Sequence, residues 1–157
     1  MSRDKYEAIN RKWGDFDCIY YDILNAIDRL KELLEDKYGS LYKASITMGL
    51  HKTYLPKILG DCYMFPRIPL LYRICKELGV SMHYVVMGYG DRTFTDSTLS
   101  FNNFLNTYDT LYKGEKHMSL NTSVCRFKQG LQKTLPLKYL IKVARRHRVT
   151  IDWLTGG

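Results

Sequence analysis

The segment from residue 39 to residue 61, GSLYKASITMGLHKTYLPKILGD, constrains the fold of this chain more than any other stretch. Its first part predicts a short helix over residues 41–48. Ser40 precedes it as the N-cap, because a serine hydroxyl accepts a backbone N–H of the first helical turn. Ala44 and Met48 are four residues apart, so they share the inward face of that helix.

Gly49 then predicts a sharp turn, since glycine adopts a positive φ without steric cost. A second helix is expected to start near His51 or Lys52 and to bury Leu55 and Ile58, which are three residues apart. The side chains expected to point away from that buried pair are polar or basic: His51, Lys52, Thr53, Lys57 and Asp61. Two short helices joined at a glycine, with a polar and basic outer face on the second, are what the major groove of DNA accepts.

These residues resemble the helix-turn-helix regulators of the phage lambda repressor and Cro type. In that family a small residue lies in the first helix, a glycine opens the turn and an aliphatic residue follows, and here these positions are Ser45, Gly49 and Leu55. Residues 65–88, FPRIPLLYRICKELGVSMHYVVMG, are similar to the closing pair of helices of the family. The resemblance implies an all-α fold of lambda-repressor-like helical modules that bind double-stranded DNA.

The resemblance also implies contact residues in the first module. They are Ser40, Tyr42, Lys43, His51, Lys52, Thr53, Lys57 and Arg67. Ser40 and Tyr42 lie where the family grips a phosphate at a helix N-terminus. Lys52 or Lys57 is expected to reach guanine O6 and N7, and Thr53 to reach a thymine, with phosphate contacts as the alternative for each.

Pro56 leaves two possibilities open for the second helix. A proline in the interior of a helix removes a hydrogen bond and clashes with the preceding turn, which would kink the helix. If the helix begins at Lys52 or Thr53, Pro56 lies near its first turn and the cost is small.

The second half of the sequence repeats the first. A shift of 69 aligns residues 53–88 with residues 122–157, 36 positions without a gap. Upstream, residues 23–34 match 101–112 only at a shift of 78, so the second copy is nine residues shorter before its reading helix. At the shift of 69 the turn glycine becomes Met118. The second copy is therefore expected either to read DNA in its turn or to keep its closing helices for packing or pairing.

The expected contact residues of this second module are Asn121, Thr122, Arg126 and Gln129. Asparagine and glutamine side chains suit adenine, and arginine suits guanine.

The expected domain organisation is an N-terminal helical arm at 1–15, a helix-turn-helix domain at 16–88, a polar linker at 89–99 and a shortened second module at 100–157. Apolar residues at spacings of three and four run from Tyr6 to Leu34. This stripe predicts either the first helix of the domain, packed in its own core, or a dimerisation arm.

Composition and charge agree with a DNA-binding protein. The chain of 157 residues has a formal net charge of +8, with −2 over residues 1–39, +4 over 40–90 and +6 over 91–157. No apolar run is long enough to span a bilayer and the first residues do not resemble a signal peptide, so we expect a cytoplasmic protein without a membrane partner. Cysteine and histidine spacings predict no metal site, and we expect no cofactor.

We therefore expect a sequence-specific regulator of transcription that acts as a repressor. A homodimer is one form in which it could bind DNA. The sequence has no paired carboxylates, triad pattern or phosphate-binding glycine loop, so we do not expect an enzyme. The alternative is a protein interaction module of the antirepressor or antitoxin kind. Binding to DNA that weakens steeply with salt would distinguish the regulator from that module.

Overall fold

The computed structural model describes residues 17–111, 124–131 and 135–156. Within these ranges the chain is mostly helical and has no strand, and its one β-type pairing is an isolated bridge between Val80 and Thr93. The prediction of an all-α fold is confirmed. The named elements are α2 (Asp17–Tyr38), α3 (Leu41–Thr47), the π-helix η2 (Pro56–Asp61), α4 (Ile68–Leu78), α5 (Met82–Met87), α6 (Asn102–Leu111), α8 (Leu137–His147) and α9 (Ile151–Thr155). A further short helix occupies residues 124–128.

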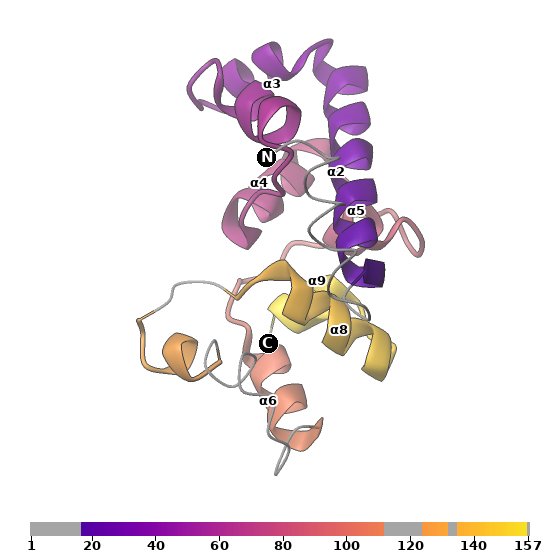
Figure 1. Ribbon diagram of the computed structural model, residues 1–157, viewed down its shortest axis with the longest axis vertical. Coiled ribbons are helices and arrows are strands. Elements are labelled where there is room, and N and C mark those ends of the chain that lie inside the picture. Colours follow the sequence, from indigo (N-terminus) through magenta and orange to yellow (C-terminus); the bar gives the residue numbers. More distant parts are fainter. Residues whose placement is uncertain (1–16, 112–123, 132–134, 157) are drawn as a thin grey trace.

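Helix α2 follows the long axis of the molecule, with α3 near one end and α6 at the opposite end (Figure 1). It packs against α3, α4, α5 and α8. Ile27, Leu30 and Leu34 from its apolar stripe are buried in the core. In its described part, the stripe therefore serves the core of its own chain, as expected for the first helix of a domain. The expected N-terminal arm lies outside the described residues.

Side-chain caps fix where three of the helices begin. Ser40 accepts a hydrogen bond from the N–H of Lys43 at 3.1 Å and starts α3. Ser81 does the same for α5, and Thr150 for α9. These caps satisfy N–H groups that have no partner inside the helix, so the polar residue before each apolar run sets the helix boundary.

Cationic side chains lie at the C-terminal ends of three helices. Arg29 of α2 donates to the carbonyl of Val85 at 2.6 Å, in the last turn of α5. Lys37 donates to a carbonyl in the last turn of α4, and Arg73 to the C-cap carbonyl of α3. A positive charge at a helix C-terminus meets both the unpaired carbonyls and the negative end of the dipole. These contacts fasten the short helices to their neighbours.

The polar segment between the halves folds back on α4. Tyr72 donates from its hydroxyl to the carbonyl of Ser97 at 2.7 Å and accepts from the N–H of the same residue at 3.1 Å. The rings of Tyr72 and Phe94 meet edge to face at 5.4 Å. The predicted linker therefore lies against the helices that precede it.

Element bounds in the second half reproduce those of the first. When 69 is added to the residue numbers of α4, they give the bounds of α8. The same shift takes the first residue of α5 to the first residue of α9. Gly79, which ends α4, has a φ of +69°, and its counterpart Arg148, which ends α8, has a φ of +55°. Buried residues of both halves belong to one hydrophobic core. The domain boundaries predicted from the sequence remain a prediction.

The halves are joined where the short helices α5 and α9 begin. The carboxylate of Asp152 accepts hydrogen bonds from the N–H of Met82 at 3.0 Å and from that of His83 at 2.9 Å. In the other direction, Nδ1 of His83 accepts the N–H of Ile151 at 3.1 Å. Each helix thus supplies the acceptor for the N-terminus of the other.

This junction is expected to weaken in mild acid. Burial lowers the pKa of His83 below its ordinary value of 6.5, and Asp152 acts in the opposite direction to a smaller extent. The unfolded chain therefore takes up a proton below about pH 6.5 that the folded chain resists, so stability falls as the pH drops through that value. Thermal melting at about pH 7.5 and about pH 5.5 checks this. His83→Gln keeps a hydrogen-bond acceptor that does not titrate, so its melting temperature is expected to fall less between the two pH values than that of the parent protein. An equal fall in both proteins would show that His83 is not the cause.

Candidate nucleic-acid interface

The turn after α3 has the predicted glycine geometry. Gly49 has a φ of +72°, and the N–H of Leu50 donates back to the carbonyl of Ser45 at 2.9 Å. Arg73 of α4 packs over this glycine, with a guanidinium nitrogen 3.8 Å from where a Cβ would lie. The chain therefore reverses tightly at the position that the sequence predicts.

The second helix begins later than predicted. His51 lies outside any helix, Lys52 and Thr53 form a turn, and helical backbone starts at Tyr54. Pro56 explains the delay, because a proline ring clashes with the carbonyl four residues earlier unless it lies in the first turn. The prediction of a start near His51 or Lys52 is wrong, and of the two possibilities for Pro56 the later start is the one adopted.

The second helix is wound as a π-helix. The N–H of Cys62 donates to the carbonyl of Lys57, five residues earlier, at 2.8 Å. Leu59 lies four residues after Leu55, a spacing that places both side chains on the same face of the helix. Leu59 is fully buried and Ile58 only half-buried. The prediction was right for Leu55 and right only in part for Ile58, which packs against the core while partly exposed.

Ser45 connects the two helices of the motif. Its side chain is fully buried, donates to the carbonyl of Leu41 at 3.0 Å and accepts the N–H of Leu55 at 3.1 Å. That N–H lies at the start of the second helix, where no carbonyl of the same helix is available. A small residue with a hydroxyl is thus required where the two helices meet.

Ser45→Ala is expected to lower the free energy of unfolding by about 1–3 kcal/mol, because it leaves the buried N–H of Leu55 without an acceptor. Urea unfolding followed by circular dichroism measures this. Thr47→Ala is the matched control, since Thr47 also bonds back along α3 but is exposed. Equal losses for both variants would show that the bond to Leu55 contributes nothing.

The residues predicted to contact DNA in the first module lie at the surface around this motif. Ser40 is half-buried and its oxygen is occupied in capping α3. The other seven are exposed: Tyr42, Lys43, His51, Lys52, Thr53, Lys57 and Arg67. Tyr42 and Lys43 come from α3, and Lys57 from η2. His51, Lys52 and Thr53 come from the turn before the second helix instead of from the helix itself.

His51 and Thr53 form a pair within that turn. Nδ1 of His51 lies 2.8 Å from the hydroxyl oxygen of Thr53 and accepts the backbone N–H of the same residue at 3.3 Å. Because a backbone N–H can only donate, Nδ1 is the acceptor in both contacts and the hydroxyl donates to it. The neutral His51 ring therefore carries its proton on Nε2.

Several exposed apolar side chains beside the motif were missed. Ile46 on α3 is 53% exposed, Tyr54 is 41% exposed and Met64 after η2 is 57% exposed. The exposure of Ile46 could have been predicted, because its position places it on the helix face opposite to the buried Ala44 and Met48. Arg73 was also missed as the residue that holds the turn, and no local pattern identifies it.

In the second half, Arg126 and Gln129 are exposed in the short segment 124–131. Asn121 and Thr122 lie outside the described residues. Lys128, which the sequence did not single out, forms an ion pair with Asp109 of α6 at 3.0 Å. The two described candidates are thus accessible, but on a different part of the molecule from the first motif (Figure 1).

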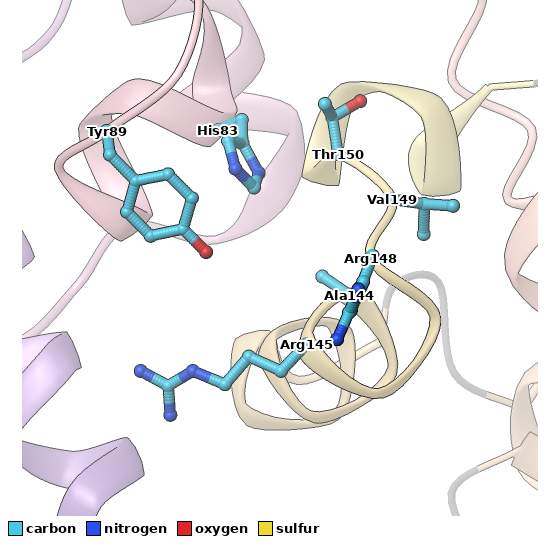
Figure 2. A pocket seen from close by; sticks show the side chains of 7 residues that line it. All are labelled: His83, Tyr89, Ala144, Arg145, Arg148, Val149 and Thr150. Atoms are coloured by element: carbon cyan, nitrogen blue, oxygen red, sulfur yellow. The ribbon is translucent and has the colours of Figure 1, made fainter.

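A separate cavity of about 320 Å³ lies beside the junction of α5 and α9. Figure 2 shows His83 and Tyr89 on one side of it and Arg145, Arg148 and Thr150 on the other. The charged groups of its lining are the two arginines, and Arg145 also pairs with Asp22 of α2. The cavity therefore borders the contact between the halves and lies outside the motif at 39–61.

Among the helices that the structure describes, none combines the length and the apolar character needed to cross a membrane. Comparison with known proteins gives no match to the chain among family models, curated proteins or solved structures.

Proposed function

We propose that this protein is a sequence-specific double-stranded DNA-binding regulator of transcription, acting as a repressor, and that it reads the major groove with residues 51–60. One observation carries the proposal: Lys52, Thr53 and Lys57 are exposed around a short helix that Leu55 and Leu59 anchor in the core. The same helix is joined to α3 by a tight glycine turn. An anchored helix with exposed polar and basic side chains is the geometry that a major groove admits.

The charges around the motif supply the affinity. Lys43, Lys52, Lys57 and Arg67 are exposed cations on or next to α3 and η2. Each one that neutralises a phosphate releases a condensed counterion, which favours binding at low salt. Base discrimination comes from the exposed side chains of the turn and of the first helical turn.

Selection of bound duplexes from a random pool tests the proposal, followed by affinity measurements at several salt concentrations. We expect one enriched motif and a plot of log K against log salt with a slope near −4, about −0.9 for each of the four cations. Enrichment of no motif, together with a flat salt dependence, would refute DNA reading.

A protein interaction module is the second candidate function, and the exposed apolar side chains favour it. Ile46, Tyr54 and Met64 lie on the same part of the chain as the basic residues. Apolar side chains among polar ones are common in protein contact surfaces. A partner protein that binds with little dependence on salt, and whose binding is lost in Ile46→Asp, would support this candidate. Loss of duplex binding in that variant with no protein bound would favour DNA.

A further inference from the structure

The second half of the chain adds a feature that the first motif alone does not have. We propose that the two halves form a two-fold-related pair within one chain, and that residues 124–131 are a second reading surface. One chain then binds a duplex site made of two unlike half-sites. This inference rests on the proposed function, because it assigns the form of the DNA target.

The same neighbours pack together in each half. In the first, α2 packs on α4 and α5, and α4 packs on α5; in the second, α6 packs on α8 and α9, and α8 packs on α9. The capping residues are equivalent too, since Ser81 and Thr150 are 69 positions apart and each accepts an N–H three residues later. Both halves therefore build one arrangement of helices over their described parts.

Two hydrogen bonds of the junction are reciprocal, one from each half, whereas the bond from the N–H of His83 to Asp152 has no counterpart among the described hydrogen bonds. At the shift of 69, Met82 corresponds to Ile151 and His83 corresponds to Asp152. The bond from the N–H of Met82 to Asp152 thus has its counterpart in the bond from the N–H of Ile151 to His83. Contacts in which each residue of one copy meets the counterpart of its own partner define an isologous, two-fold interface. Here both copies belong to one chain.

The segment 124–131 matches the first reading helix at one of its two buried anchors; at the other, where the first half has buried Leu59, it has exposed Lys128. Val124 corresponds to Leu55, and both are buried. Arg126 corresponds to Lys57, and both are exposed. In each half an apolar anchor therefore holds a short helix whose basic side chain, two residues on, is accessible.

The two outer faces differ in chemistry. Gln129 stands where the first half has Gly60, and Arg126 where it has a lysine. Arginine forms paired hydrogen bonds to guanine, and glutamine forms them to adenine, whereas a lysine approaches guanine as a point charge. A homodimer presents identical faces to a palindrome. Two unlike faces in one chain fit a site that is not palindromic.

Lys57→Ala and Arg126→Ala in the full chain are a matched pair of variants for the test. Both remove one exposed cation at equivalent positions, and thermal melting checks that each stays folded. Using the duplex selected by the full protein, we expect each variant to lose affinity about tenfold or more and to lose base preference in a different half of the site. Lys76→Ala on α4 removes the same charge elsewhere and is expected to leave base preference unchanged.

Mass measurement of the complex gives the stoichiometry, with one chain per complete site expected. Sequence-specific binding in which Arg126→Ala changes neither affinity nor preference would overturn the inference while the proposed function stands. Two chains on a palindromic site would overturn it as well. Absence of binding to any duplex would instead remove the proposed function, and the inference with it.

Discussion

Leu59→Ala is expected to lower the free energy of unfolding by about 2–5 kcal/mol, whereas Ile58→Ala is expected to cost clearly less. Leu59 is fully buried in the core, so its truncation loses apolar contact and leaves a cavity. Ile58 is only half-buried. Urea unfolding of the two variants, followed by circular dichroism, measures the difference.

This comparison tests which side chain of η2 anchors the helix in the core. Ile46→Ala is the control, because that side chain is largely exposed and its truncation is expected to change stability by at most about 0.5 kcal/mol. If Ile58→Ala is the more damaging of the two variants, Ile58 and not Leu59 is the main apolar anchor of this helix.

Combined replacement of Lys52, Thr53 and Lys57 by alanine is expected to reduce affinity for the selected duplex by at least about 100-fold and to abolish base preference. All three side chains are exposed, so the fold is expected to persist. The loss of two cations also lowers the salt slope by about 2. Fluorescence anisotropy at several salt concentrations measures both quantities.

The matched control is the double variant Lys76→Ala and Lys138→Ala, which removes the same charge from α4 and α8. It is expected to weaken binding modestly and leave base preference intact. If the triple variant retains the preference of the parent protein, residues 52, 53 and 57 do not read bases.

The parts of the fold set by local chemistry could be predicted from the sequence. Ser40 was predicted as an N-cap, and Gly49 as the turn residue, because each role depends on neighbours a few residues away. The repeat at a shift of 69 predicted the bounds of α8 from those of α4. Exposure of the candidate contact residues followed from the periodicity of the apolar positions.

The parts that local chemistry does not determine were missed. The late start of the second helix depends on whether Pro56 is tolerated, and the choice between Ile58 and Leu59 as the buried position depends on how the helix packs on the core. The role of Arg73 depends on a contact between α4 and the carbonyl at Met48, 25 residues apart. No pattern within one helix reports such a contact. DNA binding, the operator and the partners remain predictions.

The junction between α5 and α9 has a consequence for how the chain acquires its structure during synthesis. Residues of the first half leave the ribosome before those of the second, and domains fold in that order where they can. The first N–H groups of α5 find their acceptor only in Asp152, about 70 residues further on. Helix α5 therefore stays incompletely capped until the last helix has been made, and maturation of the first half waits for the second.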